Sequence, residues 1–236
     1  MPPKSTPKRN AAAALFRAKL LAWFRRHGRD LPWRRTRDPY RILVSEVMLQ
    51  QTQVARVTEY YPRFLAAFPT LGRLAAAKPG RVREAWDGLG YYRRAANLHR
   101  LAREVERRHE GRLPSEPEEL RSLPGVGRYT AGAIASFAFG RAVPAVDTNV
   151  SRVIRRAFHP RLGSEPLTER QVWATAAALL PRRARDAWAF NQAVMELGAL
   201  VCTARIARCG SCPVRGICLT GKRSSNQRHQ RQQPRQ

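Results

Sequence analysis

Long apolar segments and cysteines are scarce in this sequence of 236 residues. No run of 18 or more apolar residues occurs, so no membrane span is predicted, and the N-terminus lacks the apolar core of a signal peptide. Four cysteines are too few for the disulfide scaffold of a secreted protein. We therefore expect a soluble, cytoplasmic protein that makes no use of a membrane.

Acidic residues are also few, since 17 Asp and Glu stand against 44 Lys and Arg and leave a formal net charge of +27. No carboxylate precedes Asp30 or follows Glu196, and each of these flanks carries eight basic residues. Such a field favours a polyanionic partner, because each phosphate that a basic residue neutralises releases condensed counterions. We expect salt-dependent nucleic-acid binding and association with the nucleoid; the alternative is a solvated basic face.

The alternation of apolar and polar residues that marks a half-buried strand is missing. Helical spacing interrupted by Pro and Gly instead predicts an all-α protein, with helices over residues 11–26, 40–51, 54–68, 81–87, 91–109, 117–122, 129–139, 149–158, 168–180 and 184–200. We expect the first helix to bury Leu15, Leu20, Leu21, Trp23 and Phe24. Residues 1–10 and 220–236 have no apolar periodicity, and we expect a disordered basic arm and a disordered basic tail there.

The four cysteines fall close together, as Cys202, Cys209, Cys212 and Cys218, with the spacing C-x6-C-x2-C-x5-C. Four thiolates in so short a segment predict one multivalent metal centre. A structural zinc site usually combines two separated C-x-x-C pairs, whereas a [4Fe-4S] cluster accepts one thiolate per iron from a compact loop. The single C-x2-C favours a structural cluster; zinc and free buried thiols are the alternatives.

A glycine-rich segment, Leu123-Pro124-Gly125-Val126-Gly127, separates two predicted helices. Two glycines around one apolar residue predict a tight hairpin whose backbone N–H groups lie at a helix N-terminus, where anions such as DNA phosphate bind. An ordinary turn between helices is the alternative, because a glycine-rich turn is a weak signal by itself.

Asp147 precedes Thr148-Asn149 at the start of another predicted helix. This is a common N-cap position. A carboxylate held at a helix start can also oppose a developing cation, and the two roles are compatible.

Together, the hairpin, Asp147 and the cysteine loop resemble the helix-hairpin-helix DNA glycosylase superfamily of endonuclease III and MutY. Two further segments, SEVMLQQTQ at 45–53 and GLGYY at 88–92, resemble its MutY-type adenine DNA glycosylases. The similarity runs from about residue 15 to residue 218. It implies a six-helix barrel domain over residues 30–141, an iron-sulfur cluster domain from residues 11–29 plus 142–219, and an active site between them.

The resemblance implies a monofunctional repair enzyme that flips adenine out of DNA and hydrolyses its N-glycosyl bond, where adenine is mispaired with guanine or 8-oxoguanine. In the family Glu46 is the general acid, and its apolar surroundings in the sequence would raise its pKa. Asp147 then stabilises the sugar cation or attacks it. Tyr129 stands where relatives with a lyase step carry a Lys, and it cannot form their Schiff base. A plain core aromatic is the alternative for Tyr129.

DNA contacts follow from the same resemblance. Gln50 and Tyr91 match residues that intercalate, and Gln51 matches a contact to the opposite purine. The base pocket maps onto Arg29, Leu31, Trp33, Tyr129 and Glu196, and the phosphate-binding hairpin onto Leu123, Gly125, Val126 and Gly127. We expect a monomer acting on double-stranded DNA with mismatched or oxidised bases.

MutY proteins usually continue into a second, Nudix-like domain that helps to recognise 8-oxoguanine, whereas 18 residues follow Cys218. We expect that domain to be absent and the preference for 8-oxoguanine to be weaker. One rival function is a mismatch-specific thymine or uracil glycosylase of the same superfamily, against which Glu46 and Glu196 argue. Another is a non-catalytic cluster-containing DNA-binding protein, which would need neither Glu46 nor Asp147.

Overall fold

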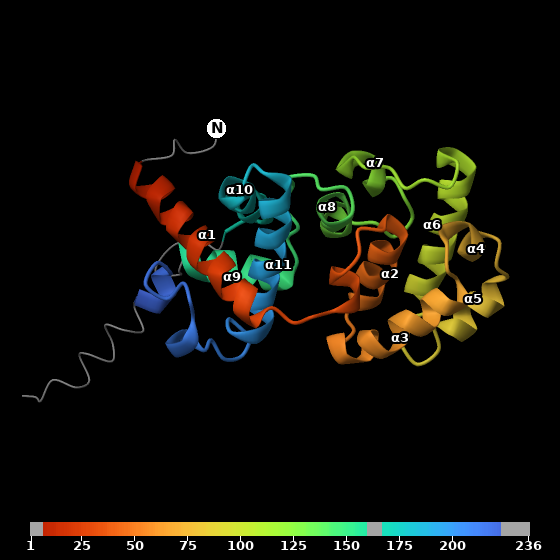
Figure 1. The fold of residues 1–236 in the computed structure, drawn as a ribbon, viewed down its shortest axis with the longest axis horizontal. Coiled ribbons are helices and arrows are strands. Elements are labelled where there is room, and N and C mark those ends of the chain that lie inside the picture. Colours follow the sequence, from red (N-terminus) through yellow and green to blue (C-terminus); the bar gives the residue numbers. More distant parts are fainter. Residues whose placement is uncertain (1–6, 160–166, 223–236) are drawn as a thin grey trace, which may run out of the picture. The chain divides into compact units, whose positions relative to one another are not determined.

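The computed structural model describes residues 7–159 and 167–222, and the regular structure in these ranges is helical (Figure 1). The helices are α1 (Pro7–His27), η1 (Pro32–Arg34), α2 (Pro39–Leu49), α3 (Val54–Ala67), α4 (Leu71–Ala75), α5 (Pro79–Ala85), α6 (Arg93–His109), α7 (Pro117–Arg121), α8 (Arg128–Phe137), α9 (Thr148–Phe158), α10 (Glu169–Leu179), α11 (Ala184–Leu200) and η2 (Cys209–Ser211). Within these ranges no strand forms, and Cys202 and Ala207 make an isolated antiparallel bridge. The all-α prediction is confirmed.

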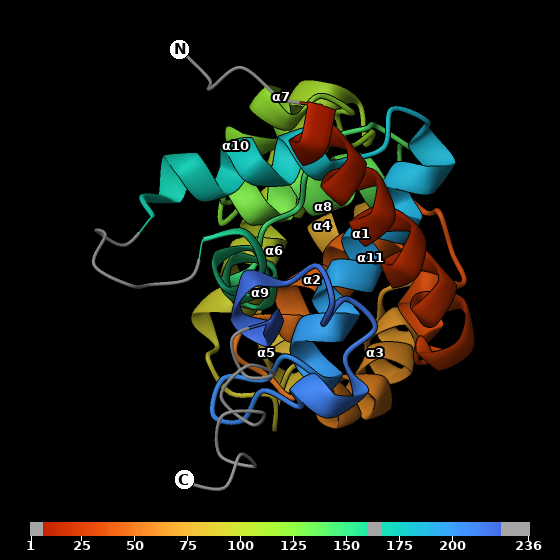
Figure 2. The same cartoon turned by 90° about the vertical axis from the view of Figure 1, so that its left-hand side faces the viewer.

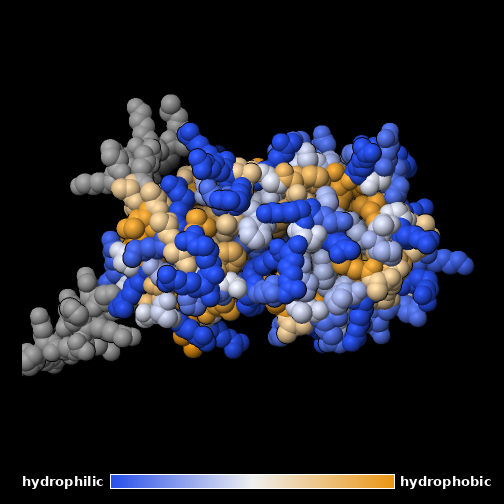
Figure 3. All heavy atoms as spheres, in the orientation of Figure 1, coloured by the Kyte–Doolittle hydropathy of each residue, from blue (hydrophilic) through white to orange (hydrophobic). Residues whose placement is uncertain are grey.

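The chain folds into two compact units. Unit 1 combines Met1–Arg29 with Ala142–Gln236, and unit 2 is Asp30–Arg141. Hydrophilic side chains cover much of the face drawn in Figure 3. Among the described helices, none is both long and apolar enough to cross a membrane.

Unit 2 is organised around α2, which packs against α3, α6 and α8. The sequence starts this helix efficiently, because Pro39 occupies its first turn and the Asp38 side chain accepts a hydrogen bond from the Arg41 backbone N–H. Every residue from Ile42 to Met48 is buried, including the polar Ser45 and Glu46. A helix that is buried all round presents its few polar groups to the protein interior, which makes Glu46 a candidate for chemistry.

Unit 1 is built from α1, α9, α10 and α11, with α11 packed against both α9 and α1 (Figure 2). Phe16 and Leu20 of α1 insert into a core that includes Ile154, Trp173 and Phe190. The cysteine segment (residues 202–218) packs on this core through Val214, and Val201, directly before the segment, is also part of the core. Burial of apolar surface, which contributes about 25 cal/mol per Å², is the main force that holds these segments together.

The first helix differs from its prediction in both phase and length. Leu15 is 48% exposed rather than buried, and Phe16 lies in the core in its place. Phe16 and Leu20 are four residues apart and share one face of the helix, whereas Leu15 is rotated by about 100° from Phe16. Residues 7–10, predicted to be disordered, belong to α1, because the fixed φ of Pro7 suits a first turn and no glycine interrupts the helix.

Other differences are confined to short elements and helix ends. The short elements α4, η1 and η2 were not predicted, because a segment of three to five residues gives only a weak periodic signal. Residues 219–222 are helical, so the predicted tail begins later than residue 220. The remaining residues of the predicted arm and tail, 1–6 and 223–236, lie outside the described part of the chain.

Candidate active site

Glu46 is a buried carboxylate with a defined partner. Its side chain lies in unit 2 on α2, the residue is 4% exposed, and the Tyr129 hydroxyl donates a hydrogen bond of 2.7 Å to its Oε2. Tyr129 is in the first turn of α8, so the packing of α2 on α8 brings together two residues that are 83 positions apart. A carboxyl group removed from water but still hydrogen-bonded is the arrangement expected of a general acid.

Asp147, in unit 1, serves as the N-cap of α9. Its Oδ1 accepts a 2.7 Å hydrogen bond from the Val150 backbone N–H, and its Oδ2 accepts one of 2.8 Å from Asn149 Nδ2. Burial raises the pKa of Asp147 above its ordinary value, although the hydrogen bonds from Val150 and Asn149 act in the opposite direction. Asp147 therefore caps α9. The two hydrogen bonds also hold its carboxylate, which is costly to bury, in one orientation.

Asp147 is also connected to the cysteine segment. Asn149 Oδ1 accepts a 2.6 Å hydrogen bond from Arg152, whose Nε donates to the Cys202 carbonyl at 2.8 Å. One turn later, Arg156 donates to the same carbonyl at 3.4 Å and to the Thr203 carbonyl at 2.7 Å. The helix that begins at Asp147 thus fixes the start of the cysteine segment.

The residues predicted to form the base pocket fall into two groups, one in each unit, and the group in unit 1 is an ion pair between Arg29 and Glu196. Glu196 is 1% exposed, and Arg29 binds both of its oxygens, with 2.7 Å from Nε to Oε1 and 3.0 Å from Nη2 to Oε2. This hydrogen bonding raises the pKa of Arg29 despite its partial burial. In unit 2, Leu31 and Trp33 are buried, and the Trp33 ring packs edge-on against Tyr61 at 5.6 Å.

The residues predicted to intercalate or to contact the opposite purine lie on two turns of unit 2, each of which contains one strained residue. Gln51 follows α2 with φ +57°, and Tyr91 precedes α6 with φ +47°, both in the left-handed region that non-glycine residues seldom adopt. Tyr91 is 61% exposed although it is large and aromatic, and Gln51 is exposed. Gln50 is half-buried and its Nε2 lies 3.5 Å from Thr130 Oγ1. Strained, exposed positions of this kind commonly mark functional sites.

The predicted hairpin is present, but its apolar side chains point inward. Leu123 and Val126 are buried, and the Val126 N–H donates to the Leu123 carbonyl at 3.2 Å to close the turn. Gly125 has φ +79° and lies against Asn97, where an added Cβ would meet the Asn97 Cβ at 2.9 Å. Gly127 is the N-cap of α8, and no side chain caps that end. The hairpin therefore presents backbone rather than side chains, as phosphate binding at a helix N-terminus requires.

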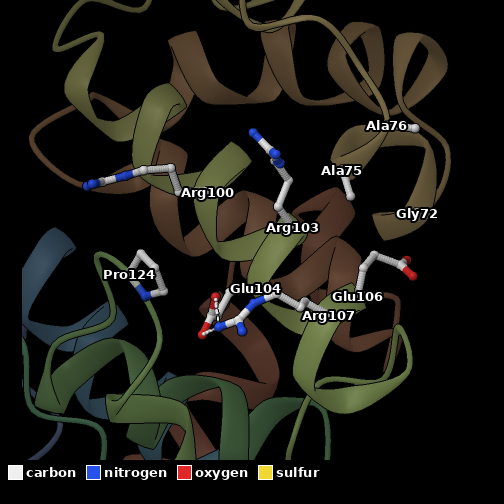
Figure 4. A pocket seen from close by; sticks show the side chains of 9 residues that line it. All are labelled: Gly72, Ala75, Ala76, Arg100, Arg103, Glu104, Glu106, Arg107 and Pro124. Atoms are coloured by element: carbon white, nitrogen blue, oxygen red, sulfur yellow. Dashed lines mark hydrogen bonds and ion pairs between the residues drawn. The ribbon is translucent and has the colours of Figure 1, made fainter.

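A groove of about 800 Å³ beside Pro124 of the hairpin was not predicted (Figure 4). Arg100, Arg103 and Arg107 follow one another along α6 on this side, and Arg107 pairs with Glu104 at 2.8 Å. The helical spacing of these arginines is the signal that could have revealed the groove. Its mixture of charges makes it unsuitable as a pocket for a neutral base.

All four cysteine side chains line one pocket, together with Arg156, Arg208 and Arg215. Burial raises the pKa of the Cys212 thiol to about 11 and also raises that of Cys218. Within the described residues, no three His, Cys, Asp or Glu side chains lie close enough to hold a single metal ion. Four sulfur ligands around one pocket are a donor set that suits a structural zinc ion or an iron-sulfur cluster.

Comparison with known proteins identifies the family of the chain. Residues 44–177 match the model of the HhH-GPD superfamily base excision DNA repair protein. The human adenine DNA glycosylase is 46% identical over 226 residues, covering 90% of this chain and 40% of the human protein; that of Mycobacterium tuberculosis is 49% identical over 196 residues, covering 83% of this chain and 64% of its own length. The chain thus spans between two fifths and two thirds of the length of these relatives.

Solved structures show the same fold. A thermostable thymine-DNA glycosylase superposes with a TM-score of 0.84 at 30% identity, over 91% of this chain and 98% of its own. An endonuclease III trapped as a covalent intermediate with DNA superposes with a TM-score of 0.75 at 26% identity, over 94% of this chain and all of its own. The chain belongs to the HhH-GPD superfamily of base excision DNA repair proteins.

Proposed function

We propose that the protein is a monomeric, monofunctional adenine DNA glycosylase that removes adenine mispaired with guanine or 8-oxoguanine in duplex DNA of the nucleoid. The observation that carries the proposal is the buried Glu46 carboxyl and its hydrogen bond from Tyr129. The names of the human and mycobacterial relatives support the assignment to adenine.

In the proposed reaction, Glu46 donates a proton to a ring nitrogen of adenine. The bond between adenine and the sugar C1′ then breaks, and its electron pair leaves with the base. The sugar becomes an oxocarbenium ion, which the ionised Asp147 stabilises or traps as a covalent adduct. Water finally adds to C1′, and its proton passes to the Glu46 carboxylate, so that Glu46 is restored for the next cycle.

The other predicted residues bind and hold the DNA in this proposal. Flipping leaves a gap in the duplex, which Gln50 and Tyr91 fill, and Gln51 contacts the opposite purine. The backbone of the hairpin binds a phosphate of the same duplex. Arg29, Leu31, Trp33, Tyr129 and Glu196 surround the extruded adenine.

The four cysteines hold a [4Fe-4S] cluster in this proposal, which supplies structural support for the segment from Cys202 to Cys218. We expect the purified protein to contain four irons per chain and to be yellow-brown. Cys209→Ser should lower the yield of folded protein before it affects the rate of adenine release, because folding of such a segment is coupled to metal binding. Elemental analysis of an anaerobic preparation checks this; one zinc and no iron would refute the cluster.

The proposal that the enzyme is monofunctional rests on Tyr129. Since a phenol cannot form a Schiff base with the abasic sugar, we expect strand cleavage to require added alkali and borohydride to trap no covalent complex. Tyr129→Lys places an amine beside Glu46 and tests whether a lyase step can be installed. Efficient borohydride trapping by the unmodified protein would overturn the monofunctional assignment.

A second candidate is a mismatch-specific thymine or uracil glycosylase, and the superposition on a thymine-DNA glycosylase favours it. Duplexes that contain A:8-oxoguanine, A:G, T:G or U:G, incubated with excess enzyme and then treated with alkali, distinguish the candidates. Cleavage at adenine supports our proposal, and cleavage at thymine or uracil supports the alternative. Binding without cleavage of any of the four would indicate a non-catalytic DNA-binding protein.

A further inference from the structure

Arg94, at the start of α6 in unit 2, is a buried cation that the proposed chemistry does not use. It is 8% exposed, and within the described residues it forms no ion pair with a carboxylate. A buried charge is costly unless hydrogen bonds compensate it. The hydrogen-bond partners of Arg94 therefore indicate which segments of the chain it positions.

The guanidinium of Arg94 donates to oxygens from two separate loops. Its Nη1 contacts the carbonyls of Val47 (3.0 Å), Met48 (2.7 Å) and Gln50; its Nη2 contacts Thr52 Oγ1 (2.9 Å) and the carbonyls of Leu89 and Gly90 (both 3.2 Å). Val47 and Met48 belong to α2. Gln50 and Thr52 belong to the turn after α2, and we call this turn the Gln loop (residues 50–53). Leu89 and Gly90 belong to the segment that we call the Tyr loop (residues 88–91).

Arg94 also caps the helix that carries Glu46. Helix α2 ends at Leu49, so the carbonyls of Val47 and Met48 belong to its last turn, where no intrahelical N–H is available to them. A cation at this end satisfies these carbonyls and interacts favourably with the helix dipole. The same group thus fixes the end of α2 and the loop that follows.

The two strained residues are held by the same contacts. Gln51 (φ +57°) lies between Gln50 and Thr52, which both accept hydrogen bonds from Arg94, and Tyr91 (φ +47°) directly follows Gly90. The Tyr91 ring lies 5.5 Å from the Arg94 guanidinium carbon, within the range of a cation–π interaction. Strained conformations persist where the surrounding structure over-determines them, and Arg94 supplies that constraint to both loops.

We infer that Arg94 is a positioning residue that locks the Gln loop and the Tyr loop in the conformation that enters DNA. The inference rests on the proposed function for what the loops do. Its structural part, that one guanidinium orders both loops, can be tested without DNA.

Arg94→Lys is the informative variant, because it keeps the positive charge but replaces a planar set of donors with one ammonium group that cannot reach six acceptors in two directions. Arg37→Lys is the matched control, since Arg37 is also in unit 2 and donates to the Phe137 carbonyl at 2.8 Å. Hydrogen exchange of the free proteins should be at least about tenfold faster in residues 50–53 and 88–91 of Arg94→Lys alone. Unchanged exchange in both loops would overturn the inference.

A DNA measurement then connects the loops to function. With 2-aminopurine next to the target adenine, wild type should increase the fluorescence as it unstacks the site, and Arg94→Lys should lose most of that signal. The single-turnover rate should fall at least about tenfold, while affinity for undamaged duplex changes less than about threefold, because phosphate contacts remain. Wild-type unstacking by a variant whose loops exchange faster would show that loop order is unimportant for insertion, and would also overturn the inference.

If Arg94→Lys does not fold, Thr52→Val tests whether Arg94 orders the Gln loop. It removes one acceptor of Arg94 from a half-buried position, and exchange should increase in residues 50–53 but not in residues 88–91. An unchanged Gln loop in this variant would count against the inference. If wild type released no adenine, the proposed function would fail, whereas the exchange results would still report on Arg94.

Discussion

Glu46→Gln is expected to reduce single-turnover release of adenine by at least about 10³-fold, near the upper part of the range for general acid catalysis. Gln has the same shape as Glu and retains an oxygen that can accept the 2.7 Å hydrogen bond from Tyr129. The variant therefore removes the transferable proton and little else. The measurement is the single-turnover rate on an A:8-oxoguanine duplex with enzyme in excess, so that product release does not contribute.

Glu84→Gln is a suitable control for this experiment. Glu84 is on α5 in the same unit, is exposed, and pairs with Arg81 at 3.0 Å. It receives the same Glu-to-Gln change at an exposed position away from the proposed chemistry, and loss of an exposed ion pair should alter the free energy of unfolding by less than about 1 kcal/mol. If Glu46→Gln released adenine at the rate of Glu84→Gln, Glu46 would not be the general acid.

The sequence predicted the long helices well because their apolar periodicity and end signals agree. Residues 184–200 show this, since the predicted and observed limits of α11 coincide. The prediction erred where two helical phases were both plausible. Leu15 and Phe16 are adjacent and apolar, and only the packing of α1 on unit 1 decides which of them is buried.

The candidate site was predicted less completely than the fold. Glu46 and Tyr129 were singled out separately, but their hydrogen bond depends on the packing of α2 on α8, which local spacing does not determine. Arg94 was not singled out at all. In the sequence it is one arginine among many in a basic segment, and its importance lies in carbonyl groups that carry no sequence signal.

Asp147→Asn is the second change with a large expected effect. We expect single-turnover adenine release to fall by about 10²–10³-fold, the usual cost of removing one electrostatic contact to a developing charge. Asn retains an oxygen for the 2.7 Å hydrogen bond from the Val150 N–H, so the cap of α9 should persist. Asp186→Asn, in the first turn of α11, is the matched control for the loss of charge in unit 1.

The pH dependence separates the chemical role of Asp147 from its capping role. Burial raises its pKa, and the ionised form is the one that stabilises a cation, so the wild-type rate should fall as the pH decreases through this raised pKa. Asp147→Asn should lack that acidic limb. A raised pKa in the folded state also means that the free energy of unfolding decreases as the pH rises from the ordinary Asp pKa through the raised one. Loss of this charge in the neutral variant should offset a weaker helix cap, so the variant should melt within about 3 °C of wild type at pH 7. A variant that retained the wild-type rate and acidic limb would leave Asp147 as a helix cap and assign the stabilisation of the cation to another group.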